Sequence, residues 1–416
     1  MRNIGITTTV PIEVLIAAGY NVIDLNNIFI STEMYAQDIE RAERDGFPKS
    51  SCAWIKGIYG ACLRCGISEI VGVVEGDCSN TRALLEVLKG RGIKVHNFSY
   101  PPEHTLSNVN AEINRFMENF DVSLEQVEAV RKELNEVRHY AKIIDELTYI
   151  DNKATGLENH ISQVSMSDFA TLSDSSTQIE INTLSGTNTL NDHDAPDDSI
   201  MLKDSEMPFA SAQLSKSDML SGSMSNVVLN ISGSDTLVGI DSTPENNLTK
   251  MDCTQSNPAK CKNRLLEKIH EIRNRTPKND KLRLGYIGVP PMTSDIYSYV
   301  ESFEASFVYN EVQREFAFPR AIEAQSIYEQ YYDYTYPYDL TFRLKEICKQ
   351  IELRRLDGII HYTQSFCHRA IEDIVIKEAL DIPVLTIEGD KSNCLDSRTK
   401  LRIEAFLDML MDLKFT

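Results

Sequence analysis

Three cysteines stand where the sequence predicts the start of a helix. Cys52 ends a loop that contains Pro and Ser, Cys78 follows a strand predicted over 70–74, and Cys367 follows one predicted over 358–362. The N-terminus of a helix offers free backbone N–H groups and a partial positive charge, which lower the pKa of a thiol and stabilise an anionic cluster. Three thiolates that converge at such positions could hold one iron–sulfur cluster.

The remaining cysteines have simpler interpretations, and any single Cys can also pack as a small hydrophobic residue. The pair Cys62-Leu-Arg-Cys65 lies inside a predicted helix and has no second Cys or His pair at zinc spacing, which favours packing. Cys394 follows Glu388-Gly-Asp390 closely enough to lie near a site. Three further cysteines are predicted to have no role: Cys253, Cys261 and Cys348.

Ionisable side chains near the predicted strand ends are the candidate acid–base groups. Glu75 and Glu388 stand at such ends, where a carboxylate can transfer a proton or cap the next helix. His361 lies in a predicted strand near Cys367 and could transfer a proton, whereas its other interpretation is a buried, hydrogen-bonded His. The chain has no Gly-x-Gly-x-x-Gly, Walker A or Gly-x-Ser-x-Gly motif, so dinucleotide, nucleotide or serine-hydrolase chemistry lacks its usual signature.

The elements that position these residues alternate between strand and helix. In the first part of the chain, strands are predicted over 4–8, 21–25, 70–74 and 94–98. Helices are predicted over 11–18 and 81–89, and residues 52–60 are predicted to be the start of another helix. After residue 280, strands are predicted over 282–289, 307–309, 358–362 and 382–387, and helices over 340–354, 368–380 and 396–413. This alternation favours parallel sheets covered by helices, with ligands beyond the carboxyl ends of the strands.

Between these two parts the composition changes twice. Residues 106–156 are predicted to be helical, with Ser123 and Gln126 spaced as a capping box. Residues 157–258 are rich in Ser, Thr, Asp and Asn and contain no Arg, Tyr or Trp. Such a segment cannot bury enough apolar surface to offset the entropy of ordering it, so it is predicted to be a disordered acidic insertion, with a small Ser/Thr-rich β module as the alternative.

The sequence therefore predicts an α/β protein with two Rossmann-like parallel-sheet domains joined by a helical connector and interrupted by a long disordered insertion. The predicted boundaries are 1–105 for the N-terminal α/β domain, 106–156 for the connector, 157–258 for the insertion and 259–416 for the C-terminal α/β domain.

Charge and cysteine usage restrict the environment of the protein. The chain has 42 Lys and Arg against 62 Asp and Glu, a formal charge of -20, which argues against binding nucleic acid or an anionic membrane surface. No apolar run approaches the ~20 residues that a membrane span needs, and the N-terminus lacks the pattern of a signal peptide. Nine cysteines, an odd number, favour reduced thiols. We expect a cytoplasmic protein.

Seven separated segments occur in an order that is specific to one family. They include Gly46-Phe-Pro-Lys-Ser-Ser-Cys52, Glu75-Gly-Asp-Cys78 and Ser365-Phe-Cys-His-Arg369, and in full they cover 5–11, 24–29, 46–56, 75–80, 285–291, 365–369 and 388–390. The chain resembles the 2-hydroxyacyl-CoA dehydratase D-component family, of the 2-hydroxyglutaryl-CoA dehydratase and benzoyl-CoA reductase superfamily. The resemblance covers about 1–150 and 280–416 and excludes the insertion.

The resemblance implies an oxygen-sensitive [4Fe-4S] protein of anaerobic metabolism with three cysteine ligands, which fall on Cys52, Cys78 and Cys367. It implies a lyase, in which an ATP-hydrolysing activator supplies one low-potential electron, the thioester carbonyl of an acyl-CoA receives it, and the radical loses its 2-hydroxyl group. It also implies three partners: the activator or reductase protein, the acyl-CoA substrate, and a second subunit in a homodimer or heterodimer.

Two other functions remain open at this stage. An ATP-dependent reductase of the benzoyl-CoA reductase or double-cubane type belongs to the same superfamily, and a double-cubane cluster would need additional ligands such as Cys62, Cys65 and Cys394. A non-catalytic cluster carrier is the alternative from another class.

Overall fold

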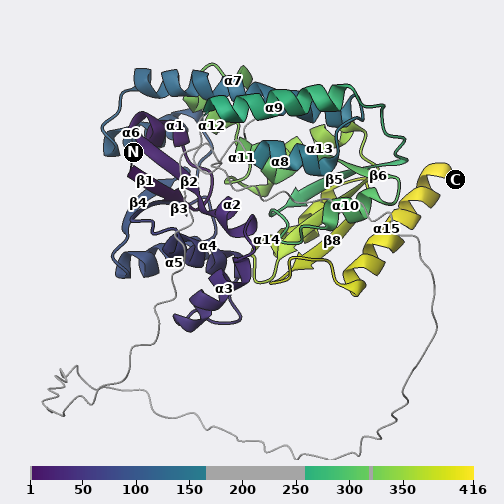
Figure 1. Cartoon of the computed structure of the whole chain (residues 1–416), viewed down its shortest axis with the longest axis horizontal. Helices are drawn as coiled ribbons and strands as arrows, with labels where there is room; N and C mark the ends of the chain where they lie inside the picture. Colours follow the sequence, from purple (N-terminus) through teal and green to yellow (C-terminus); the bar gives the residue numbers. More distant parts are fainter. Residues whose placement is uncertain (1, 165–257, 318–321) are drawn as a thin grey trace, which may run out of the picture. The chain divides into compact units, whose positions relative to one another are not determined.

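A computed structural model describes residues 2–164, 258–317 and 322–416, and it contains two four-stranded parallel sheets (Figure 1). The first has the order β2-β1-β3-β4 and consists of β1 (Arg2–Ile6), β2 (Tyr20–Asp24), β3 (Glu69–Glu75) and β4 (Lys94–Ser99). The second has the order β6-β5-β7-β8 and consists of β5 (Leu282–Gly288), β6 (Ala305–Asn310), β7 (Gly358–Gln364) and β8 (Val384–Gly389). The predicted α/β fold with two parallel sheets is confirmed.

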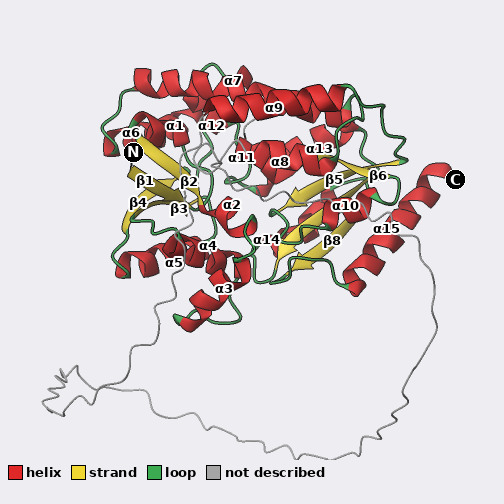
Figure 2. Ribbon diagram, in the orientation of Figure 1, coloured by secondary structure: helices red, strands yellow, loops and turns green. Residues whose placement is uncertain are grey.

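Helices connect and flank these strands (Figure 2). Those before residue 274 are α1 (Ile12–Ala17), α2 (Leu25–Ile30), α3 (Tyr35–Arg44), α4 (Ala53–Arg64), α5 (Ser79–Gly90), α6 (Leu106–Asn119), α7 (Leu124–Tyr149), α8 (Gly156–Val164) and α9 (Pro258–Arg273). Those after it are α10 (Ile296–Glu301), α11 (Glu311–Ala317), α12 (Ile327–Tyr332), α13 (Leu340–Arg354), α14 (Arg369–Ala379) and α15 (Ser397–Phe415). None of the helices in the described ranges is long and apolar enough to cross a membrane.

The long helix α7 takes part in the packing of both sheets. It begins with the predicted capping box, in which the Ser123 side chain and the Gln126 side chain each bond the other residue's backbone N–H. Its buried apolar residues, from Val127 through Leu134 to Leu147, belong to the core cluster of the first sheet. Near its end, Asp145 accepts hydrogen bonds of 2.8 and 2.6 Å from Arg354 of α13, which flanks the second sheet. The helix therefore links the two parallel sheets.

Helix α12 follows β5 and β6 of the second sheet in the sequence, yet it packs in the core of the first sheet. Tyr331 donates hydrogen bonds to the backbone oxygen of Val10 at 2.8 Å and to Glu13 at 2.9 Å. Glu13 also accepts from Arg138 of α7 and from Gln330, at 2.8 and 2.7 Å. This buried polar network fixes α1, α7 and α12 against one another.

The segment predicted to be a disordered insertion lies outside the described residues, except for residues 157–164 and Pro258, and so does Cys253. Residues 157–164 form most of α8, because Thr155 and Glu158 make reciprocal capping hydrogen bonds at 2.9 and 3.1 Å. The buried Asn159 then donates to Asp145 at 2.8 Å. The signal in the sequence is Thr155-Gly-Leu-Glu158, a capping box at the edge of the polar segment, which marks the start of a helix there.

Candidate functional site

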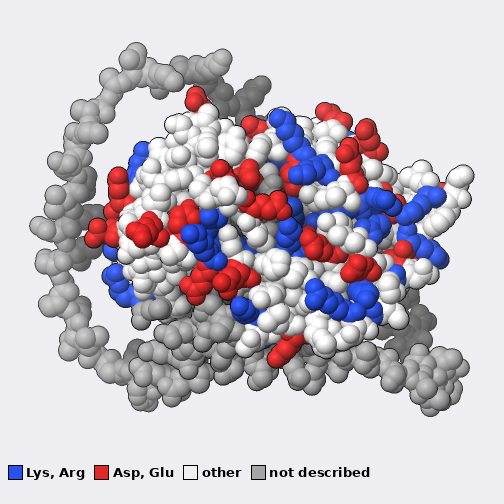
Figure 3. Space-filling view, turned by 90° about the horizontal axis from the view of Figure 1, so that it is seen from above, with Lys and Arg blue, Asp and Glu red and all other residues white. Residues whose placement is uncertain are grey.

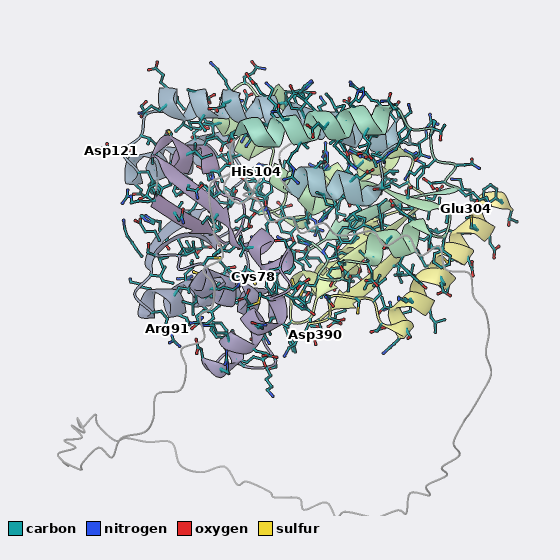
Figure 4. All side chains as sticks on the ribbon, in the orientation of Figure 1. Cys78, Arg91, His104, Asp121, Glu304 and Asp390 are labelled. Atoms are coloured by element: carbon teal, nitrogen blue, oxygen red, sulfur yellow. The ribbon has the colours of Figure 1, made fainter. Side chains whose placement is uncertain are left out.

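Each of the three predicted ligands stands at the start of a helix. Cys52 is the N-cap of α4 and Cys78 is the N-cap of α5, directly after β3. Cys367 comes just before His368, the N-cap of α14, and its N–H donates to the backbone oxygen of Gln364 at the end of β7. In Figure 4, Cys78 lies between the two sheets. The strand-to-helix positions expected for Cys78 and Cys367, and the loop-to-helix position of Cys52, are present in the structure.

The three thiols are close enough to influence one another electrostatically. Burial raises the pKa of Cys52 to about 11, the backbone N–H groups of Ile55 and Trp54 act in the opposite direction, and the thiols of Cys367 and Cys78 raise it further. The pKa of Cys367 is also raised, first by burial and also by Cys78. The fold thus brings together three cysteines that are widely separated in sequence and come from both sheets.

Backbone N–H groups at the helix starts surround the Cys78 and Cys367 sulfurs as well. Burial raises the pKa of Cys78, whereas hydrogen bonds from the backbone of Asn80 and Thr81 lower it. At Cys367, burial is opposed by the backbone N–H and the guanidinium charge of Arg369. These donors favour sulfur in its anionic form, but burial outweighs them, so the free thiols stay protonated at neutral pH.

The donor set is compatible with an iron–sulfur cluster. Within the described ranges, no group of three or more His, Cys, Asp or Glu side chains is arranged to hold one metal ion. In a [4Fe-4S] cluster each cysteine binds a different iron atom, so the three ligands need not converge on one point. The three thiols here are partly enclosed and have N–H donors at their sulfur atoms, which is compatible with each one binding a separate iron atom.

Arg369 is a residue of this site that the sequence analysis did not select. Its guanidinium carbon lies 3.9 Å from the ring centroid of Tyr336, and its Nη2 donates to the backbone oxygen of Tyr336 at 2.8 Å. Arg343 lies over the same ring at 5.5 Å and is fixed by Glu311. The signal in the sequence was only the position of Arg369, two residues after Cys367.

Segments from both halves of the chain meet beside Cys78. Gly76 has a φ of +88°, and a Cβ at this position would lie 2.8 Å from Tyr100 and 3.2 Å from Pro337. Burial raises the pKa of the neighbouring Asp77, which accepts a hydrogen bond from Thr81 at 3.1 Å. Glycine is required at this turn because of both its backbone conformation and the close approach of its neighbours.

The candidate acid–base residues occupy three different environments. Glu75 is exposed and lies 3.9 Å from Arg82. Glu388 is also exposed and accepts a hydrogen bond of 2.7 Å from Ser365. His361 is fully buried, its Nδ1 lies 2.8 Å from Asp373, and its Nε2 has no hydrogen-bond partner among the described residues. Burial lowers the pKa of His361.

Two other cysteines, Cys62 and Cys65, lie away from the start of α4. Cys62 is buried in α4, where burial raises its pKa to about 12, and Cys65 caps the end of that helix. With a rise of about 1.5 Å per residue, they lie roughly 15 and 20 Å along the axis from Cys52. Cys348 and Cys394 are exposed. Packing inside α4 is therefore enough to explain the presence of Cys62. Cys62 and Cys65 are too far along the helix to join Cys52 in one site.

The surface shown in Figure 3 carries acidic and basic side chains interspersed, with no single extended basic area on that face.

A family model described as 2-hydroxyglutaryl-CoA dehydratase, D-component, matches residues 7–183 and 245–410. The matched ranges include all three cysteines at the helix starts and every strand of the two sheets except β1, which ends at Ile6. No curated protein matches the chain.

Proposed function

The chain belongs to the 2-hydroxyglutaryl-CoA dehydratase D-component family, and on this premise we propose that it is an iron–sulfur enzyme that dehydrates a 2-hydroxyacyl-CoA. Cys52, Cys78 and Cys367 are the proposed ligands of one [4Fe-4S] cluster. The supporting observation is that their thiols, at the starts of α4, α5 and α14, interact with one another. When bound, such a cluster supplies a low-potential one-electron site and one iron atom that has no cysteine ligand and can take an oxygen ligand.

The protein's own groups have three tasks in this proposal. Backbone N–H groups from the first turns of the three helices donate to the sulfur atoms and stabilise their negative charge. The guanidinium of Arg369 adds a fixed positive charge near Cys367. The enclosure of Cys52, which is 7 % exposed, limits the access of water and oxygen.

A D-component works with an activator component in this family, so the proposed electron source is an ATP-dependent activator protein. The thiols must remain reduced, which is the condition of a cytoplasmic protein. Glu75, His361 and Glu388 remain the proposed acid–base groups. Among them, Glu388 is next to the site, because its carboxylate accepts from Ser365, two residues before Cys367.

The first test is the iron and sulfide content of protein purified without oxygen. We expect about four iron atoms per chain, whereas about eight would support the double-cubane alternative. Single replacement of Cys52, Cys78 or Cys367 by Ala should remove most of the cluster absorbance. Cys348→Ala is the matched control, because Cys348 is an exposed cysteine on α13. Equal losses in all four variants, or no loss in any, would contradict the ligand assignment.

A further inference from the structure

The carboxylate of Glu43 joins the segment that leads to Cys52 with the lobe that carries Cys367. This lobe consists of the second sheet, β5 to β8, with the helices that flank it. Glu43, near the end of α3, accepts a hydrogen bond of 2.8 Å from Nζ of Lys56 in α4. The same oxygen of Glu43 accepts a second bond from Nζ of Lys391, in the loop after β8. Lys391, which follows the last strand of the second sheet, is therefore bonded to α3, a helix in the N-terminal half of the chain.

The Lys56 side chain carries this contact to the Cys52 loop. Its Nζ also donates to the backbone oxygen of Lys49 at 3.1 Å, and Lys49 is three residues before Cys52. The backbone N–H of Lys56 bonds the backbone oxygen of Cys52 at 3.3 Å. Lys56 is thus fixed at both ends to the loop whose conformation sets the position of the Cys52 sulfur.

The side chains of Lys56, Glu43 and Lys391 are exposed to different extents, and this decides which of them can be replaced without leaving a buried charge unpaired. Lys56 is 0 % exposed, Glu43 is 16 % exposed, and Lys391 is 39 % exposed. The buried ammonium of Lys56 needs a counter-charge, which Glu43 provides, while Lys391 can leave without uncovering a buried charge. Hydrogen bonds from Lys391 and Lys56 lower the pKa of Glu43 to about 2. The carboxylate is therefore ionised at any physiological pH.

An apolar contact lies beside this ionic one. Met292, in the segment after β5, is 7 % exposed and belongs to a hydrophobic cluster with Phe29, Ile39 and Ala53, which comes directly after Cys52. The two halves of the chain thus meet around the start of α4 through one buried apolar residue and one partly exposed ion pair.

We propose that the Glu43–Lys391 ion pair is a latch that holds the Cys52 loop against the lobe carrying Cys367, and that both are positioning residues for the cluster site. The inference rests on the proposed function, since it assumes that Cys52 and Cys367 share a ligand. The latch acts on the Cys52 loop through Lys56 and the backbone oxygen of Lys49, so it does not require Glu43 or Lys391 to be a ligand. Lys391 is the residue to change, because Glu43 also neutralises the buried Lys56.

The first experiment uses the metal-free full chain and hydrogen–deuterium exchange. In Lys391→Ala, exchange in segments 46–52 and 390–394 should rise roughly two- to five-fold, the size that a partly exposed ion pair supports. Lys391→Arg should restore the wild-type rate, and high salt should raise exchange in the wild type. Lys400→Ala is the control, because Lys400 is 38 % exposed and pairs with Asp295 within its own lobe. Equal exchange in Lys391→Ala and wild type would overturn the latch.

The second experiment measures how fast the reconstituted protein loses iron to a chelator, followed by cluster absorbance. Loss should be roughly two- to five-fold faster in Lys391→Ala than in the wild type, Lys391→Arg or Lys400→Ala. Equal rates would overturn the positioning role even if exchange changes. A wild-type protein that binds no cluster would reject the proposed function instead, and the exchange experiment on metal-free protein would still decide whether the latch exists.

Discussion

The guanidinium of Arg369 stacks on the ring of Tyr336, 3.9 Å from its centroid, at a point two residues along the chain from Cys367. Glu372 completes the arrangement by accepting a hydrogen bond of 3.1 Å from the same guanidinium. A positive charge is thereby held beside the proposed cluster, although Arg369 itself is almost fully buried.

Replacing Arg369 by Gln should lower the reduction potential of the cluster, because a nearby positive charge stabilises the reduced, more negative form. Arg369→Lys keeps the charge but not the planar stacking, so its potential should lie between those of Arg369→Gln and the wild type. Potentiometric titration followed by electron paramagnetic resonance measures this. A potential that is the same in all three proteins would show that the charge of Arg369 does not act on the cluster.

The ion pair between Asp145 and Arg354 should be a strong determinant of stability. Both side chains are buried, so Asp145→Ala leaves the charge of Arg354 without its counter-ion, and we expect a loss of about 3–5 kcal/mol in the free energy of unfolding. Lys262→Ala, which removes an exposed pair with Glu136, should cost less than about 1 kcal/mol. Urea denaturation of both variants gives the comparison, and similar losses would contradict it.

Stability should also depend on pH through Glu301. Burial raises the pKa of Glu301 to about 7, with Asp280 and Glu158 contributing, while Lys278 and the hydrogen bond from Gly156 act in the opposite direction. Because the folded state holds this proton more tightly than the unfolded state, stability should fall as pH rises from about 4.5 to about 7.

The drop attributable to Glu301 should be on the order of 3 kcal/mol, because each tenfold difference in proton affinity between the folded and unfolded states corresponds to about 1.4 kcal/mol. Glu301→Gln can keep the hydrogen bond from Gly156 but cannot titrate, so its unfolding free energy should be flatter over this range. Chemical denaturation at a series of pH values measures both proteins. Parallel curves for variant and wild type would show that other groups control the pH dependence.

The number of electrons consumed per turnover should distinguish a dehydratase from a reductase. With an ATPase activator, ATP and a strong reductant, the protein should convert a 2-hydroxyacyl-CoA to an enoyl-CoA with no net consumption of electrons after activation. A reductase would consume electrons and ATP in every turnover. Cluster transfer to an acceptor protein without turnover of either substrate would identify a carrier.

Much of the fold could be predicted because its strands are short apolar runs between turn residues. The helix predicted over 340–354 has the observed bounds of α13, and the strand predicted over 70–74 differs from β3 by one residue at each end. Short helices such as α2 and α12 were not predicted, because each is about one and a half turns long and its hydrophobic pattern covers too few residues. Asp24, whose side chain caps α2, was the local signal that could have indicated the first of these.

The candidate site was predictable only in part. Local pattern placed Cys78 and Cys367 at strand-to-helix turns, each at the carboxyl edge of its own sheet, but it could not show that these two turns approach each other. Pattern could not reveal that Lys391 bonds Glu43 or that Arg369 stacks on Tyr336, because these contacts depend on how distant segments pack. His361 is enclosed because β7 is buried along its whole length, as the buried interpretation of this residue implies.

The position of α12 in the core of the first sheet affects how the chain can fold as it leaves the ribosome. Ile4 and Val71 of that sheet share a hydrophobic cluster with Ile327 and Tyr331, so the first 150 residues emerge long before their packing partners. Until α12 is synthesised, the nascent chain must keep an apolar surface exposed, a state in which chaperones and aggregation compete. Premature termination before residue 327 should therefore yield a product that is cleared by proteolysis, even though it contains every strand of the N-terminal sheet.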